Sequence, residues 1–486
     1  MGHKILVVLD DTGNRSDIIT DIIGNKGFGD VIVKRRPLAS HFSERLRRSF
    51  PDFSMVHVHS FFEFNDVLKT VEEDDERTRI LHFFSRHIIS DPEKASLSLK
   101  KLAFVEKPFR AVSRGKTAAA LFKDPESYAD FLRAALSCSG TDEACACIKD
   151  SFDIEGLTDI GTVGNFIQCV TGSFDARYFN SLSGDNYTLV KQSSNKTKIK
   201  AEYTFYHLLP DDMKFWFVMP FNYRETDENA SYTMERIHMT DLAVKFVHGS
   251  IDAAEFAAVL DKYFYFFKSR HAKPVPRAEY ERIAKSLYED KVRARLEDLK
   301  ALPAFQRIAE LMKAGCACGN VDALFDRYRS LKVKVEARNS YPSVSVIGHG
   351  DPCFANVLYN KSTQTLKFID PKGALKEEEL WTNPYYDVAK LSHSVCGRYD
   401  FFNNALFDIS INEDFRAELN IGFDNAAHKE LFRKKLAENG FDYLTVRVYE
   451  ASLFISMLPL HIDCPHKVFG FILNAMQILE EIENEI

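Results

Sequence analysis

Two carboxylates and one amide lie close together between residues 349 and 370. Asp351 and Asn356 belong to the run HGDPCFAN, and Asp370 ends the apolar run LKFID. Phosphoryl transfer requires such a set, because magnesium must neutralise the developing phosphoryl charge while one carboxylate orients the attacking hydroxyl. We therefore predict kinase chemistry with Asp351 as the base and with Asn356 and Asp370 as the Mg²⁺ ligands. A structural loop capped by Asp and Asn side chains is the alternative.

Short strands are expected to position these three residues. The apolar residues 344–347 predict a strand that leads into His349, so that Asp351 lies on a loop at a strand end. A second hairpin, formed by 357–359 and 366–369, turns at 360–364. This hairpin is expected to bring Asp370 beside the first loop.

A kinase also needs a cation for the nucleotide phosphates and a carboxylate that holds the cation in place. YFNSLSGDNYTLVKQS predicts two strands joined by a turn, with Lys191 on the second strand. KIKAEYTFYHLL predicts a helix that stops at Pro210 and carries Glu202 within an apolar stripe. A carboxylate in such a stripe is costly unless paired, so we predict a Lys191–Glu202 ion pair. A surface lysine and a solvated glutamate are the alternative.

The segment HGDPCFANVLYN followed by LKFIDPKG resembles the aminoglycoside phosphotransferase and choline kinase group. The resemblance implies an α+β, two-lobed, protein-kinase-like fold with ATP and Mg²⁺ as cofactors, and it assigns the same roles to Lys191 and Glu202. It also implies that Asp387 braces the catalytic loop. Gly350 stands where protein kinases commonly carry an arginine, which favours a small-molecule kinase. His349 is predicted to be a packed, hydrogen-bonded support and not a proton carrier.

The nucleotide-holding segments have weaker patterns. No glycine-rich run precedes the strands, and Gly172 and Ser173 are the best candidates for backbone donors to the phosphates. SYTMERI predicts a strand that enters a hinge between lobes, where backbone groups from Glu235 to Ile237 would hold adenine. An ordinary edge strand is the alternative.

The first 165 residues have a different organisation. The strand candidates KILVVL, DVIVKR, MVHVHSF, RILHFF and LAFVEKP alternate with helical patterns, which predicts an α/β domain with a doubly wound sheet. LAFVEKP and GLTDIGTVGNF resemble sugar-nucleotide pyrophosphorylases, and the resemblance implies a phosphate contact by Lys107. That family expects a phosphate loop where LDDTG stands at 9–13, and a metal-binding Asp where SRH stands at 85–87. We therefore expect a degenerate nucleotidyltransferase-like domain without turnover.

These patterns predict two domains. The nucleotidyltransferase-like α/β domain occupies 1–165, and the kinase-like phosphotransferase domain occupies 166–486. The latter divides into a small lobe at 166–237 and a large helical lobe at 238–486. EYERIAKSLYEDKVRARLEDLK, within the large lobe, predicts an exposed helical insertion.

Composition restricts the partners and the compartment. The 486 residues are 45% hydrophobic, enough to bury more than one core. A formal net charge of -7 with scattered charges argues against a nucleic-acid partner. No apolar run reaches the roughly 18 residues of a membrane span, so we expect a cytoplasmic protein without membrane insertion. The nine cysteines are expected to be reduced thiols, with a zinc site from the two C-x-C pairs as the alternative.

The sequence thus favours transfer of the γ-phosphate of ATP to a hydroxyl of a small molecule. A sugar, an amino alcohol or an aminoglycoside-like compound fits, and the fused first domain hints at bacterial surface polysaccharide. A catalytically inactive pseudokinase or assembly module, and a bifunctional kinase plus nucleotidyltransferase, are the alternatives. The segment KEEELWTNPYYD predicts either an acceptor site with aromatic faces at Trp381, Tyr385 and Tyr386, or an acidic turn with aromatic residues in the core.

Overall fold

The computed structural model describes residues 4–72, 78–138, 140–171, 180–185 and 187–486. Its contacts divide the chain into two compact units. The first unit comprises Met1–Phe174 with His248–Ser250, and the second comprises Asp175–Val247 with Ile251–Ile486. The division therefore differs from the predicted boundary at residue 165, because helix α7 (Val163–Thr171) belongs to the first unit.

A six-stranded sheet forms the centre of the first unit, with the strand order β4-β1-β5-β8-β7-β9. The strands are β4 (Ser54–Val58), β1 (Ile5–Asp10), β5 (Arg79–Phe84), β8 (Lys116–Phe122), β7 (Phe109–Ser113) and β9 (Ser151–Asp153). Strand β1 pairs in parallel with β4 and β5, whereas β8 is antiparallel to both β5 and β7. The sheet is thus mixed. Every residue of β1 is buried, as expected for a central strand covered on both faces.

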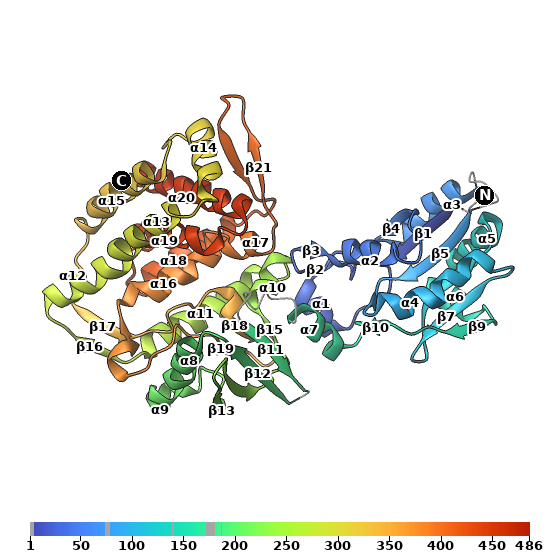
Figure 1. Cartoon of the computed structure of the whole chain (residues 1–486), viewed down its shortest axis with the longest axis horizontal. Helices are drawn as coiled ribbons and strands as arrows, with labels where there is room; N and C mark the ends of the chain where they lie inside the picture. Colours follow the sequence, from blue (N-terminus) through green and yellow to red (C-terminus); the bar gives the residue numbers. More distant parts are fainter. Residues whose placement is uncertain (1–3, 73–77, 139, 172–179, 186) are drawn as a thin grey trace. The chain divides into compact units, whose positions relative to one another are not determined.

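Helices cover both faces of this sheet (Figure 1). Val7 and Leu9 of β1 share one core with residues of α2 (Leu38–Leu46) and α4 (Pro92–Leu99). Leu6 and Val8 share the opposite core with residues of α3 (Phe64–Glu72) and α5 (Pro125–Ser137). The alternation of side chains along β1 therefore produces three layers, helix, sheet and helix.

Of the five predicted strands in this unit, one is shorter than predicted and one is wrong. DVIVKR contributes only β2 (Ile32–Val33), which pairs with β3 (Arg36–Pro37) outside the main sheet. The turn between them has positive φ at Lys34 and Arg35, which reverses the chain before a longer strand can form. LAFVEKP begins in the 3₁₀ helix η2 (Lys100–Phe104), whose Leu102 is buried. Three strands of the main sheet, β7, β8 and β9, lie outside the predicted runs.

The second unit contains a four-stranded antiparallel sheet with the order β11-β12-β14-β13. Its strands are β11 (Asn180–Gly184), β12 (Thr188–Ser193), β13 (Pro220–Glu225) and β14 (Ala230–Glu235). The predicted hairpin is present as β11 and β12. Helix α8 (Lys196–Leu208) packs on this sheet and begins at the N-cap Asn195, whose side chain accepts from Lys198 N. The buried face of α8 includes Ile199 and Glu202, as the periodicity predicted.

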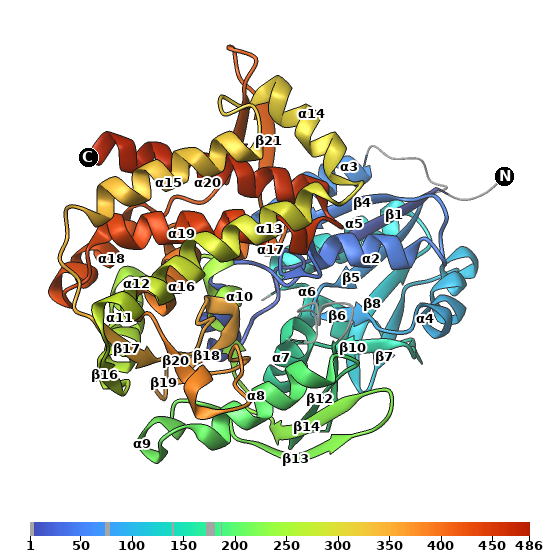
Figure 2. The same ribbon diagram turned by 60° about the vertical axis from the view of Figure 1, so that its left-hand side comes forward.

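The rest of the second unit is mainly helical, with short strands at the site described below. Helix α19 (Tyr443–Met457) is buried on all sides from Thr445 to Met457, and α15 (Val321–Glu336) and α20 (Pro465–Glu485) pack against it (Figures 1 and 2). Helix α13 (Lys291–Lys300) lies in the segment predicted as an exposed insertion, yet its Val292, Leu296 and Leu299 are buried and it contacts α19. That prediction is therefore wrong for one face of α13. None of the described helices combines the length and the apolar character that a bilayer span requires.

Candidate active site

A buried lysine joins two carboxylates in the second unit. Lys191 Nζ lies 2.7 Å from Glu202 Oε2 and 2.8 Å from Asp370 Oδ1. Side chains of Lys191 and Glu202 are only 3% and 1% exposed, whereas that of Asp370 is 44% exposed. The predicted Lys191–Glu202 ion pair is thus present, and Lys191 also forms an ion pair with Asp370. Burial alone would lower the pKa of Lys191, but the charges of Asp370 and Glu202 raise it above its usual value and keep the ammonium protonated.

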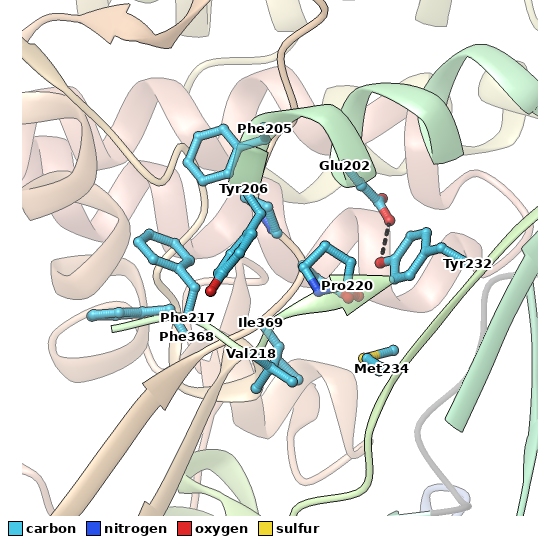
Figure 3. A pocket seen from close by; sticks show the side chains of 12 residues that line it. Glu202, Phe205, Tyr206, Phe217, Val218, Pro220, Tyr232, Met234, Phe368 and Ile369 are labelled. Atoms are coloured by element: carbon cyan, nitrogen blue, oxygen red, sulfur yellow. Dashed lines mark hydrogen bonds between the residues drawn. The ribbon is translucent and has the colours of Figure 1, made fainter. Parts of the chain in front are cut away.

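The sheet and helix α8 together produce this pair. Strand β12 holds Lys191 opposite Tyr232 of β14, and α8 presents Glu202 from its buried face. Tyr232 Oη donates a hydrogen bond to Glu202 Oε2 at 3.1 Å, which is drawn as a dashed line in Figure 3. The carboxylate therefore has a neutral donor as well as a cation, which offsets the cost of its burial.

Asp351 lies on the loop that follows β17 (Val344–Ile347) and pairs with a cation from another element. Asp351 Oδ1 is 2.9 Å from Lys390 Nζ, on helix α16 (Pro384–Val395). Burial would lower the pKa of Lys390, but the charge of Asp351 outweighs burial and raises it above its usual value. Lys390 was not among the residues predicted from the sequence. The available signal was its position three residues after Asp387, which places both on one helical face.

Hydrogen bonds to backbone carbonyls hold Asn356, and the residue before Asp370, near the same loop. Asn356 Nδ2 donates to the Asp351 carbonyl at 2.8 Å, and the Asn356 carbonyl accepts from Ile369 N at 3.0 Å. Asn356 ends the 3₁₀ turn η4 (Phe354–Asn356) before the hairpin of β18 (Val357–Asn360) and β19 (Thr365–Phe368), which matches the predicted hairpin. Asp370 follows with φ of +55°, a conformation that turns the chain out of the strand. The hairpin thus brings Asp370 to the loop of Asp351.

Asp387 holds the backbone of this loop. Its Oδ2 accepts from His349 N at 2.9 Å and its Oδ1 from Gly350 N at 2.8 Å. Arg270 Nη1 donates to the same carboxylate at 3.0 Å, and the Arg270 and Asp387 side chains are 1% and 0% exposed. Gly350 has φ of +86°, and an added Cβ would lie 2.5 Å from Lys372 Cβ. A bulkier residue is therefore excluded at this position for steric reasons.

His349 connects the loop of Asp351 to the end of β19. Its Nδ1 accepts from Asp351 N at 3.1 Å, so Nε2 carries the proton and donates to the Ile369 carbonyl at 2.9 Å. The ring stacks on Phe217 with centroids 5.8 Å apart and an interplanar angle of 9°. Burial lowers the pKa of His349 below its usual value, which favours this single neutral form.

The predicted hinge lies at the end of β14. Glu235 pairs with Thr188, and Arg236 N donates to the Tyr187 carbonyl at 2.8 Å. The Ile237 carbonyl accepts from Met239 N at 2.9 Å. These bonds show which backbone groups of residues 235–237 are engaged within the protein. Gly172 and Ser173, predicted as phosphate donors, lie outside the described residues.

A cavity lies beside the buried ion pair, between α8, the sheet and the end of β19 (Figure 3). Its lining combines Glu202 and Asp370 with apolar and aromatic side chains, among them Phe205, Tyr206, Phe217, Val218, Met234 and Phe368. The cavity reaches the carboxylates that hold Lys191, whereas Asp351 and Asn356 are absent from its lining. The cavity therefore lies beside the carboxylates that contact Lys191, and Asp351, predicted to be the base, does not line it.

The acidic segment after Asp370 does not present its tyrosines as binding faces. Tyr385 and Tyr386 are 6% and 4% exposed, and Tyr386 Oη accepts from Lys291 Nζ at 2.9 Å. Lys273 Nζ lies 4.1 Å from the centroid of the Trp381 ring. The prediction of an acceptor site at these tyrosines is therefore wrong, because they pack in the core as the alternative stated.

The acids at the end of β1 in the first unit are committed to internal contacts. Asp11 accepts from the backbone of Phe28 at 2.6 Å and of Gly29 at 2.7 Å, and from Ser85 Oγ at 2.5 Å. Asp10 accepts from His82 Nε2 at 3.1 Å. Lys107, predicted to contact a phosphate, is 58% exposed and lies 2.9 Å from Asp150. These contacts explain the two acids as supports of the loops around β1.

Comparison with known proteins gives a distant likeness only. Neither a protein-family model nor a curated protein matches the chain. Among solved structures, a thermostable mutant of aminoglycoside phosphotransferase APH(4)-Ia in its apo form is similar, with 11% identity and a TM-score of 0.33, over 65% of this chain and 98% of that chain. A further variant of that mutant, in a ternary complex with ADP and hygromycin B, has 12% identity and a TM-score of 0.35 over the same shares.

Proposed function

We propose that this protein is an ATP-dependent phosphotransferase that moves the γ-phosphate to a hydroxyl of a small molecule. The observation that carries the proposal is the contact of Lys191 with both Glu202 and Asp370. Phosphoryl transfer needs a fixed cation, a carboxylate that holds this cation in place and a second carboxylate that binds the metal. Lys191 is the cation here, and it contacts both Glu202 and Asp370. On this proposal the four-stranded sheet with α8 is the small lobe of a kinase-like unit.

The donor set fits Mg²⁺. Asn356 uses its amide nitrogen on the Asp351 carbonyl, which leaves Oδ1 as the atom to bind a cation. Asp370 binds Lys191 through Oδ1, so Oδ2 would be the oxygen that holds the ion. Both are hard oxygen ligands, as Mg²⁺ prefers. When bound, the ion would neutralise phosphate charge at this end of the site.

The other residues of the site have separate roles in nucleotide binding, in proton transfer and in charge stabilisation. Lys191 neutralises phosphate oxygens of the nucleotide, and the backbone near Glu235 and Ile237 holds adenine. Asp351 orients the acceptor hydroxyl and takes its proton. Lys390, 2.9 Å from Asp351, supplies positive charge where the transferred phosphoryl group meets the acceptor. His349 and Asp387 keep the loop backbone in place.

A screen of ATP consumption tests this function. Purified protein with Mg-ATP is offered sugars, choline, ethanolamine and aminoglycosides, and the phosphorylated product is identified by mass spectrometry. We expect acceptor-dependent turnover that falls at least about 100-fold in Lys191→Met. Lys273→Met is the matched control, because Lys273 pairs with the Trp381 ring and not with a carboxylate of the site.

Nucleotide binding without turnover on any acceptor would instead favour the pseudokinase alternative. For the first unit we propose binding or scaffolding without nucleotidyl transfer, because Asp10 and Asp11 are engaged by neighbouring loops. Release of pyrophosphate from CTP, UTP or dTTP with a phosphorylated acceptor would contradict this part of the proposal. The loss of that release in Lys107→Ala would assign the activity to the first unit.

A further inference from the structure

Three side chains of types that can bind a metal ion lie close together at one end of β4 in the first unit. One ligand atom from each of Asp30, His57 and His59 lies within 4.8 Å of the other two. His59 Nε2 is 3.3 Å from Asp30 Oδ1, and His57 Nδ1 is 4.0 Å from the same oxygen. The two imidazole rings have centroids 4.0 Å apart. Both histidines therefore direct a ring nitrogen towards one carboxylate.

A buried carboxylate fixes the orientation of His57. Its Nε2 lies 3.0 Å from Asp11 Oδ2, and the Asp11 side chain is fully buried. An ionised carboxylate only accepts, so Nε2 carries the proton and Nδ1 of neutral His57 offers its lone pair. Metal-binding histidines are held in this way by a second carboxylate that sets the tautomer and the ring angle.

The same carboxylate positions the loop that carries Asp30. Asp11 accepts from Phe28 N and Gly29 N, and Gly29 immediately precedes Asp30. An added Cβ on Gly29 would lie 2.5 Å from His57 Nε2, so only glycine permits this close approach. Asp11 thus holds in place both the loop that carries Asp30 and the ring of His57. On the other side of the cluster, Glu63 Oε2 lies 3.8 Å from His59 Nδ1.

We propose that Asp30, His57 and His59 bind a divalent transition-metal ion such as Zn²⁺. His57 Nδ1, His59 Nε2 and the Asp30 carboxylate are the ligands. Two imidazoles with one carboxylate suit Zn²⁺, Co²⁺ or Fe²⁺, whereas Mg²⁺ and Ca²⁺ prefer oxygen ligands alone. Three protein ligands leave at least one position for water or for an oxygen anion. This site is independent of the phosphotransferase residues from Lys191 to Lys390 that are named in the proposed function, which belong to the second unit.

Titration calorimetry of the full-length, chelator-treated protein with ZnCl₂ tests the proposal. We expect one tight site in the wild type, and at least about 100-fold weaker binding in His59→Ala and in Asp30→Ala. His271→Ala is the matched control, because His271 is 44% exposed and lies 2.9 Å from Asp212, outside the cluster. This variant should bind as the wild type does.

Cobalt provides a second readout that separates the cluster from the nine cysteines. Co²⁺ in the proposed site gives ligand-field bands without the intense thiolate charge-transfer band, and His59→Ala removes them. His59 is 47% exposed, so the substitution should preserve folding, which circular dichroism checks. Unchanged Zn²⁺ affinity in both ligand variants, no tight Zn²⁺ site in the wild type, or a thiolate band would each overturn the proposal.

Discussion

Lys390 Nζ lies 2.9 Å from Asp351 Oδ1, and it comes from the same helix as Asp387. Helix α16 therefore supplies both a charge for the proposed base and the carboxylate that holds the base's loop. The carboxylate of Asp387 accepts hydrogen bonds from the backbone amides of this loop. Lys390 instead contacts the side-chain carboxylate of Asp351. The two residues can be separated by experiment, because one should affect stability and the other catalysis.

Asp351→Asn should remove nearly all turnover while leaving ATP affinity within a few-fold of wild type. A base acts on the acceptor hydroxyl and not on the nucleotide, and general base catalysis contributes about 10²- to 10⁴-fold. Steady-state kinetics at saturating substrates and equilibrium ATP binding measure the two effects. More than about a tenth of wild-type kcat in this variant would remove Asp351 from its proposed role.

Lys390→Met should lower kcat by about 10²-fold, since the charge it supplies matters most when negative charge develops during transfer. Lys390→Arg should recover part of that loss, because the positive charge is retained. The pH profile of kcat separates this effect from simple misfolding. Equal kcat in Lys390→Met and in the wild type would show that Lys390 only pairs with Asp351.

Asn356→Ala and Asp370→Ala should each raise the magnesium concentration needed for nucleotide binding. Either change deletes one oxygen ligand from a hard cation, and the loss should exceed tenfold in the midpoint. Magnesium titrations followed with a fluorescent nucleotide provide the measurement. Asn360→Ala, at the far end of β18, is the control, and midpoints equal to wild type in both ligand variants would contradict the assignment.

Asp387→Ala should destabilise the second unit by about 3–5 kcal/mol, because it leaves the buried guanidinium of Arg270 unpaired. Replacing both residues, in Asp387→Leu with Arg270→Met, should cost less than the single change. Urea unfolding followed by tryptophan fluorescence reports on the correct unit, since both tryptophans, Trp216 and Trp381, belong to it. A double variant less stable than Asp387→Ala would argue against the pairing as the cause.

The first unit should lose stability in acid through Asp10. Burial would raise the pKa of Asp10, but its bond to His82 and the charge of that ring lower it from 3.8 to about 2. The stabilisation is therefore complete above pH about 4 and is lost as the pH falls through 2, amounting to about 2 kcal/mol. Hydrogen exchange of peptides from β1 measures this loss. Asp10→Asn should abolish the pH-dependent part, and the same dependence in that variant would contradict it.

Local patterns predicted the elements of the candidate site well. The hairpins at β11–β12 and β18–β19 and helix α8 have turn, alternation and capping signals within a few residues of one another. The Lys191–Glu202 pair followed from one polar residue within an apolar helical stripe. The contact between Lys191 and Asp370 joins residues 179 apart in the sequence, and local patterns alone do not specify such a contact.

Other features required the folded chain. The run DVIVKR reads as a strand, but the reversal at Lys34 and Arg35 ends it after two residues. The sequence around Tyr385 and Tyr386 is compatible with binding faces and with core packing, and their burial decides for the core. The pair His57 and His59 was available in MVHVHSF, where alternation places both on one face of a strand. Its third ligand, Asp30, comes from a different loop, so the cluster was missed.

The imidazole of His349 joins two segments that follow different strands, the loop of Asp351 after β17 and the segment of Asp370 after β19. The ring bonds to the carbonyl of Ile369, one residue before Asp370, and to the amide of Asp351. On the proposed function, this connection would limit changes in the distance between Asp351, the proposed base, and Asp370, the proposed metal ligand. Motion shared by the two segments would then leave that distance unaltered, so a correct geometry between the two residues would not require a rigid protein around them.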